Sequence, residues 1–238
     1  MSSSGELDVH RLKVVDAFDL DDELRSILKP ADLVRDSEGR RHRLPRYFYE
    51  VPSHEVAVSI RLSPHFGLNE FLLTDVREAP RLHEFPRYIP CAVRILAFYL
   101  EQFRLTIGAS VHISVNGGYR SPSHKLVQNA TPHMWGTAAD VYRIGSTILK
   151  TQESIDRYND VAEDVSDEIR VLPYGHAIGN AADDHLHFDI GYLTLVPRAI
   201  SEDRLEQPQE SRPRFAFEDR RQKDRRGRSE SSGAVDEE

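Results

Sequence analysis

The strict alternation of apolar and ionisable residues near the end of the folded part of the chain restricts the fold more than any other feature. Residues 183–190 read DDHLHFDI. Such alternation predicts a β-strand with one buried face, because successive side chains of a strand point to opposite sides. The apolar face consists of Leu186, Phe188 and Ile190. The other face consists of His185, His187 and Asp189. That second face must either meet solvent or form part of a metal site.

Regular elements are predicted on both sides of this strand. Apolar positions recur every three or four residues over 91–105, which predicts a core helix with Pro90 in its first turn. A polar-faced helix is predicted within 148–169. Strands are predicted over 110–115, 136–144 and 184–193, with a short one near 170. The predicted helices lie in the first part of the chain and between the strands, while most of the predicted strands lie in the last part. The predicted class is therefore α+β, with a mainly antiparallel sheet and flanking helices.

The first third of the chain is less regular. Residues 15–29 fit a short amphipathic helix that ends before Pro30. Residues 31–45 are polar and basic, and predict a linker or an exposed loop. Residues 46–64 contain two strand-like runs around a Pro-Ser turn, and residues 68–75 fit a short helical segment.

Length and composition predict one domain with appendages. The chain has 238 residues, 39% of them hydrophobic, which suffices for a single core. We expect an N-terminal extension over 1–60, which contains a helix, a linker and the start of the sheet. A single domain follows over 61–201. Residues 202–238 are expected to be a disordered charged tail, because they have almost no apolar residues to bury.

Charge and hydropathy limit the classes of partner. The net charge of −8 argues against general nucleic-acid binding. No stretch approaches the roughly 18 consecutive apolar residues of a membrane span. The first residues lack the basic and apolar regions of a secretory signal, so we expect cytoplasmic synthesis without a signal peptide. The basic segment 212–228 leaves open that the tail tethers the domain to a larger assembly.

Three segments carry residues suited to metal chemistry. They are TPHMWGTAAD at 131–140, GGYRSP at 117–122 and DDHLH at 183–187. Catalytic Zn²⁺ usually takes three His or carboxylate ligands and leaves one position for water. The spacing of His133 and Asp140 fits one ligand on a loop and the next on the following strand. Any one histidine is more often structural than a ligand, so the combination of segments is what indicates a hydrolytic zinc site.

These segments resemble the motifs of the zinc D-Ala-D-Ala carboxypeptidase and dipeptidase family of peptidoglycan metallopeptidases. TPHMWGTAAD is similar to the signature Ser-x-His-x-x-Gly-x-Ala-x-Asp, with Thr131 in place of serine. GGYRSP looks like the family's Gly-Tyr-Arg-Ser-Pro segment, and HLHFDIG like its closing His-x-Asp strand. The resemblance covers about residues 62–193. It implies the fold that this family shares with the Hedgehog signalling domain.

The resemblance also implies a role for each matching residue. His133, Asp140 and His187 would hold Zn²⁺. Asp184, three residues before the last ligand, would act as general base and then as general acid. Arg120 would stabilise the oxyanion or hold the substrate, which agrees with the chemistry of a guanidinium beside a developing negative charge. Many family members have Glu where Asp184 stands, although Asp also occurs in the carboxypeptidase branch.

The sequence allows two roles for several neighbouring residues. His185 is expected to support the site rather than to bind the metal. Asp189 either accepts a hydrogen bond from an imidazole or is a solvated strand carboxylate. His176 either lines the cleft or faces solvent. Trp135 and Tyr119 either flank the substrate or belong to the core.

The resemblance predicts a zinc-dependent peptidase that cleaves D-amino-acid-containing peptides of bacterial peptidoglycan, as a carboxypeptidase or an endopeptidase. One alternative is a non-catalytic, zinc-stabilised module that binds cell wall or a protein partner. Another is a cargo domain that the tail tethers to an assembly. A peptidoglycan substrate would require release by lysis or delivery by an injection machine, whereas a cytoplasmic dipeptidase would require neither.

Overall fold

The computed structural model describes residues 7–175 and 184–197. Within these ranges four α-helices accompany sheets that are mostly antiparallel, which confirms the α+β class. The helices are α1 (Asp22–Leu28), α2 (His54–Ser59), α3 (Val93–Ile107) and α4 (Gln152–Val165). None of the helices in the described ranges is long and apolar enough to cross a membrane.

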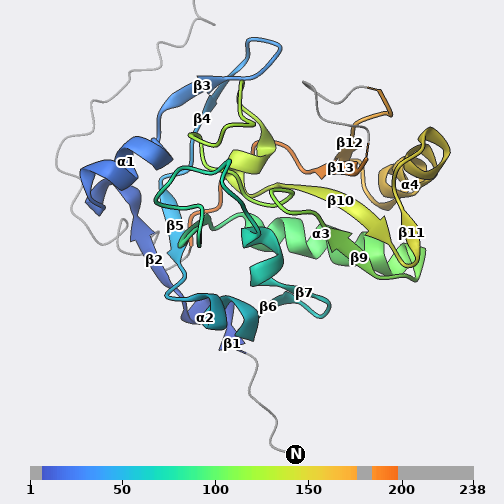
Figure 1. Ribbon diagram of the computed structural model, residues 1–238, viewed down its shortest axis with the longest axis horizontal. Helices are drawn as coiled ribbons and strands as arrows, with labels where there is room; N and C mark the ends of the chain where they lie inside the picture. Colours follow the sequence, from blue (N-terminus) through green and yellow to red (C-terminus); the bar gives the residue numbers. More distant parts are fainter. Residues whose placement is uncertain (1–6, 176–183, 198–238) are drawn as a thin grey trace, which may run out of the picture. The chain divides into compact units, whose positions relative to one another are not determined.

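A five-stranded sheet contains the alternating strand. Its strands are β9 (Val111–Ile113), β10 (Ala138–Ile144), β11 (Thr147–Ile148), β12 (Arg170–Val171) and β13 (Leu186–Asp189). Strand β10 pairs antiparallel with β9, β11 and β13, and β12 pairs with β13 (Figure 1). The register between β10 and β13 sets Asp140 directly opposite His187. Two residues that are far apart in the sequence therefore become cross-strand neighbours.

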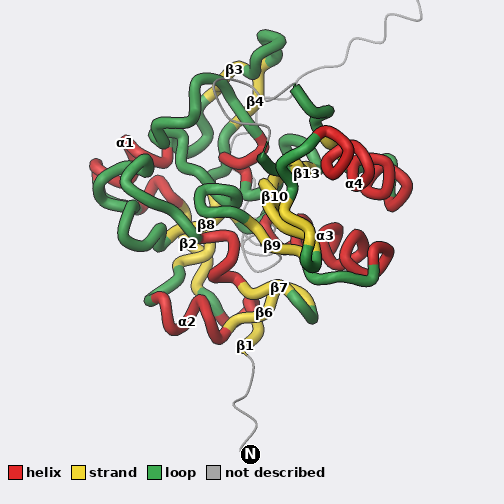
Figure 2. The backbone as a smooth tube through the Cα atoms, turned by 45° about the vertical axis from the view of Figure 1, so that its right-hand side comes forward, coloured by secondary structure: helices red, strands yellow, loops and turns green. Residues whose placement is uncertain are grey.

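Helix α3 supplies the apolar layer against this sheet. Leu186 and Phe188 of β13 are completely buried, as the alternation predicts, and the Phe188 ring lies 5.6 Å from that of Phe103 on α3. Helix α4 contacts α3, β12 and β13. Figure 2 shows both helices beside β10 and β13. The buried face of β13 thus anchors the strand, and its other face is left for the ionisable side chains.

The first sixty residues contribute strands to two further sheets, which also contain strands from later parts of the chain. Strands β2 (Lys13–Asp16), β5 (Tyr47–Glu50) and β8 (Tyr88–Pro90) form one antiparallel sheet. Strands β1 (Leu7–Asp8), β6 (Ile60–Ser63) and β7 (Phe66–Gly67) form the other, in which β1 and β6 are parallel. Strands from before and after residue 60 therefore share both sheets.

Residues 31–45 form a hairpin, so the prediction of a linker or exposed loop was wrong. Strands β3 (Leu33–Arg35) and β4 (Arg41–Arg43) pair antiparallel. The turn is organised by the buried carboxylate of Asp36, which accepts hydrogen bonds from the Arg40 backbone and side chain and contacts His42 Nε2 at 2.8 Å. Because polar contacts rather than apolar alternation build this hairpin, hydropathy did not reveal it.

Two other N-terminal predictions were wrong in part. Only the second half of 15–29 is helical, because residues 13–16 pair with β5 and Asp21 caps α1 through the Leu24 N–H at 3.0 Å. The helix ends before Pro30 as expected. In 46–64, the first run is β5, but the second begins as α2 and becomes β6 only at its end.

The core helix predicted over 91–105 is present as α3, although Pro90 ends strand β8 instead of lying in the helix. The expected helical segment at 68–75 is a short 3₁₀ helix over Leu68–Leu72.

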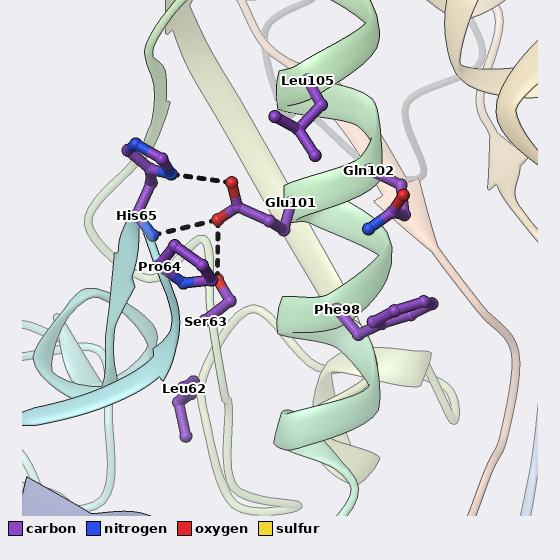
Figure 3. Close-up of a pocket in the computed structure, with 8 residues that line it drawn as sticks. All are labelled: Leu62, Ser63, Pro64, His65, Phe98, Glu101, Gln102 and Leu105. Atoms are coloured by element: carbon purple, nitrogen blue, oxygen red, sulfur yellow. Dashed lines mark hydrogen bonds and ion pairs between the residues drawn. The ribbon is translucent and has the colours of Figure 1, made fainter.

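A cavity of about 410 Å³ lies along α3, beside the turn between β6 and β7 (Figure 3). Its polar end is the buried carboxylate of Glu101. That carboxylate accepts hydrogen bonds from Ser63 Oγ at 3.0 Å and from the backbone N–H of His65 at 3.0 Å, and lies 2.7 Å from His65 Nδ1. These contacts tie the β6–β7 turn to the core helix.

Candidate metal centre

His133 approaches the centre from a 3₁₀ helix, Pro132–Trp135, that precedes β10. Gly136 ends this helix with φ +66°, a conformation that glycine adopts without a side-chain clash, and turns the chain into the strand. His133 is buried, and its Nδ1 lies 2.7 Å from the carbonyl oxygen of Gly118. A carbonyl only accepts hydrogen bonds, so Nδ1 carries the proton and Nε2 keeps its lone pair free.

Asp140 and His187 meet across the β10–β13 ladder. His187 Nδ1 lies 2.9 Å from Asp140 Oδ1, and His133 Nε2 lies 3.2 Å from the same oxygen. On its far side, His187 Nε2 lies 3.1 Å from Asp189 Oδ2. Asp189 is buried and is fixed by the Gly191 N–H at 2.7 Å. It therefore acts as a hydrogen-bond acceptor for the imidazole and not as a solvated strand carboxylate.

The structure brings together the three residues that the sequence assigned as ligands. One donor atom each from His133, Asp140 and His187 lies within 4.8 Å of the others. Ligand atoms of a tetrahedral ion with bonds of roughly 2.0–2.1 Å are about 3.3 Å apart. Asp140 Oδ1 lies 2.9 Å from His187 Nδ1 and 3.2 Å from His133 Nε2, close to that spacing. Both imidazoles also have an acceptor for the second ring nitrogen, an arrangement typical of metal-binding histidines. The group could hold a metal ion.

Burial and nearby charges shift the pKa values of the two imidazoles in opposite directions. Burial and the nearby charge of Arg120 lower the pKa of His133 to about 4. Burial opposes protonation of His187 as well, but hydrogen bonds to Asp140 and Asp189 outweigh it and raise that pKa to about 9. Burial alone would raise the pKa of Asp140, yet His133 and Arg120 hold it well below its ordinary value. Of the two imidazoles, His187 is therefore the more basic.

Arg120 contacts the ligand carboxylate directly. Its guanidinium pairs with Asp140 Oδ2, the oxygen that faces away from the imidazoles, and its Nε donates to the Asn116 carbonyl at 2.5 Å. The loop that carries Arg120 needs glycine at 118, because a Cβ there would lie 2.4 Å from the Phe71 carbonyl oxygen. Arg120 therefore fixes which oxygen of Asp140 meets the two histidines.

Asp184 lies outside the three-residue group. It is exposed, and its Oδ1 lies 2.9 Å from His185 Nδ1. His185 Nε2 in turn lies 3.6 Å from Asp140 Oδ1. His185 thus lies between Asp184 and the metal-binding group. Strand alternation predicted that His185 and His187 share a face, but no sequence signal indicated the contact between His185 and Asp184.

The remaining candidates divide into core residues and residues outside the described ranges. Trp135 is buried and donates through Nε1 to the Arg43 carbonyl at 3.1 Å, and Tyr119 is also buried. Both are core aromatics. His176, Asp183 and the predicted tail over 202–238 lie outside the described residues.

The fold and the site define this chain as an α+β protein with a candidate metal centre of two histidines and one aspartate. No protein-family model, curated protein or solved structure matches it.

Proposed function

We propose that this protein is a zinc-dependent peptidase that hydrolyses D-amino-acid-containing peptides of bacterial peptidoglycan. The observation that supports it most is the convergence of His133 Nε2, Asp140 Oδ1 and His187 Nδ1, with the second nitrogen of each imidazole already held by an acceptor. Two imidazoles and one carboxylate are a common donor set for catalytic zinc. The substrate class and the Hedgehog/DD-peptidase-like fold rest on the resemblance of the three sequence segments.

Zinc bound by these residues would lower the pKa of a bound water to about 7 and polarise the scissile carbonyl. The chain's own contribution begins with Arg120, which keeps Asp140 ionised and oriented through the pairing with Oδ2. In the proposed reaction the same guanidinium also stabilises negative charge on the substrate oxygen.

We assign proton transfer to Asp184 acting together with His185. The Asp184 carboxylate accepts a hydrogen bond from His185 Nδ1, which leaves His185 Nε2 as a base on the side of the metal ligands. Nε2 takes the proton from the attacking water, and the Asp184 carboxylate stabilises the imidazolium that results. The proton then passes from Nε2 to the leaving amine. This proposal keeps Asp184 as a proton-transfer residue and makes His185 its intermediary.

The test is digestion of purified muropeptides by the zinc-loaded protein, with the products identified by mass spectrometry. We expect cleavage next to a D-amino acid. Asp184→Asn and His185→Gln should each lower the rate by about 100-fold or more while zinc is retained, and the double variant should lose little beyond that. Asp160→Asn, an exposed aspartate on α4, is the matched control. Undiminished cleavage by Asp184→Asn would rule out the assignment of Asp184, and absence of cleavage by the wild type would rule out the peptidase.

One observation favours a second candidate, a non-catalytic module stabilised by zinc. Arg120 is engaged with Asp140, and Asp184 is exposed outside the ligand group, so neither is committed to a substrate. A module of this kind would bind muropeptides and show no turnover at any zinc loading.

A further inference from the structure

The exposed face of the β3–β4 hairpin carries three arginines. The register sets Arg35 opposite Arg41 and Leu33 opposite Arg43. Cross-strand partners and alternate residues point the same way, so all four side chains share one face. All four residues are exposed. We call this the arginine face, and define it by Arg35, Arg41 and Arg43.

No carboxylate among the described residues pairs with the arginine face. Arg35 and Arg43 each donate to a backbone carbonyl, of Gly39 at 2.8 Å and of Ala31 at 2.9 Å. These bonds hold two guanidinium groups in place without neutralising them. Their remaining N–H groups are available to an anion.

The acids of the hairpin are already occupied by a different arginine. Arg40 pairs with Asp36 at 2.8 Å and with Glu38 at 2.9 Å. Several arginines elsewhere on the surface have carboxylate partners, as in Arg25–Asp22, Arg77–Asp75 and Arg81–Asp21. Like charges directly opposite each other, such as Arg35 and Arg41, destabilise a strand pair. Three unneutralised arginines are thus a distinct feature in a chain with a net charge of −8.

The other face of the hairpin is fixed to the loop that carries His133. The Arg43 carbonyl accepts the Trp135 indole N–H at 3.1 Å, and the Arg35 carbonyl accepts the Ala130 N–H at 2.8 Å. The His42 ring stacks on Tyr192, with centroids 3.6 Å apart. Figure 1 shows β3 and β4 next to the yellow-green segment that leads into β10. The hairpin that carries the arginine face is therefore hydrogen-bonded to the residues on either side of His133.

We propose that the arginine face binds a linear phosphodiester polymer without bases, of the poly(glycerol phosphate) type found in bacterial walls. Guanidinium groups bind phosphate oxygens bidentately. Arg41 and Arg43 are alternate residues of β4, about 7 Å apart, and Arg35 lies opposite Arg41, so the face presents a cluster of three phosphate-binding groups. It carries no aromatic side chain on which a base could stack, which disfavours a nucleic acid. The choice of a wall polymer rests on the proposed function, whereas the anion-binding face itself does not.

Binding of the full chain to poly(glycerol phosphate), measured at several salt concentrations, tests this proposal. Three phosphate contacts predict that the arginine face contributes about 2 to the slope of log Kd against log salt, in addition to the contribution of the basic segment 212–228. Replacing two arginines, as in Arg35→Gln/Arg41→Gln, should lower the slope by about 1.4. Arg25→Gln/Arg77→Gln removes the same charge elsewhere and should keep the wild-type slope. Arg41→Gln alone, whose side chain has no hydrogen bond within the described residues, should lower the slope by about 0.7 without affecting folding.

Absence of binding by the wild type, or an unchanged slope in both arginine-face variants, would overturn the proposal. Equal or tighter binding of single-stranded DNA with the same number of phosphates would overturn the assignment to a base-free polymer. Hydrolysis plays no part in this measurement because the polymer contains no peptide bond. Failure of muropeptide cleavage with intact polymer binding would therefore contradict the proposed function alone.

Discussion

The two candidate histidine ligands are oriented by acceptors of different charge. His133 is held by the neutral Gly118 carbonyl, whereas His187 is held by the carboxylate of Asp189. A carboxylate partner makes an imidazole more basic and a stronger metal ligand. Asp189 therefore influences metal affinity without touching the metal.

Asp189→Asn should weaken zinc binding by about 10- to 100-fold, because the neutral amide oxygen is a weaker hydrogen-bond acceptor for the His187 imidazole than the carboxylate. The measurement is a competition titration against a chelator of known affinity. Asp167→Asn, which changes an exposed aspartate before β12, is the control and should bind zinc like the wild type. Equal zinc affinity in Asp189→Asn and the wild type would show that this carboxylate does not support the site.

The β6–β7 turn and helix α3 depend on one another through Glu101. Burial would raise the pKa of this carboxyl, but hydrogen bonds from Arg104, His65 and Ser63 outweigh it and lower the pKa below its ordinary value of 4.5. A lowered pKa in the folded state contributes stability above the unfolded pKa, and that stability is lost as pH falls through the folded pKa.

Glu101→Gln should therefore lower the free energy of unfolding by about 1–3 kcal/mol at neutral pH, because donors lose a charged acceptor. The difference from the wild type should shrink below about pH 4.5, as the wild-type carboxyl becomes protonated. Urea denaturation at pH 7 and at lower pH measures both effects. A difference that stays constant over this range would contradict the assigned charge of Glu101.

Elements with strong apolar periodicity could be predicted from the sequence, and elements built on polar contacts could not. Helix α3 and strand β13 follow from repeating buried positions. The β3–β4 hairpin depends on Asp36 as a buried acceptor, and β2 depends on pairing with β5. Neither contact leaves a local pattern, because each partner is chosen by the folded chain.

The same distinction applies to the site. His133, Asp140 and His187 could be predicted because their segments resemble a family signature. The position of Arg120 against Asp140, and of His185 between Asp184 and the ligands, depends on side-chain directions that spacing does not fix.

The whole described fold requires the N-terminal residues. Phe48, Tyr49 and Val51 are essentially completely buried, and β5 forms the middle of the sheet with β2 and β8. Removing residues 1–60 would expose the edge of β8 and part of the core. The first sixty residues therefore contribute structure that the later part of the chain needs.

A fragment over residues 61–201 should accordingly fail to unfold cooperatively, whereas the full chain should show one sharp thermal transition. Circular dichroism and differential scanning calorimetry compare the two. A fragment with a sharp transition and wild-type zinc affinity would show instead that the first sixty residues are a dispensable extension.

The most direct test of the proposed metal centre is the zinc content of the purified protein, measured by inductively coupled plasma mass spectrometry after dialysis. We expect about one zinc per chain in the wild type and in His112→Ala, which changes a histidine on β9 outside the ligand group. His133→Ala and His187→Ala should each retain almost none while they keep the wild-type circular dichroism spectrum. A wild-type protein without zinc, or full zinc occupancy in both ligand variants, would contradict the account.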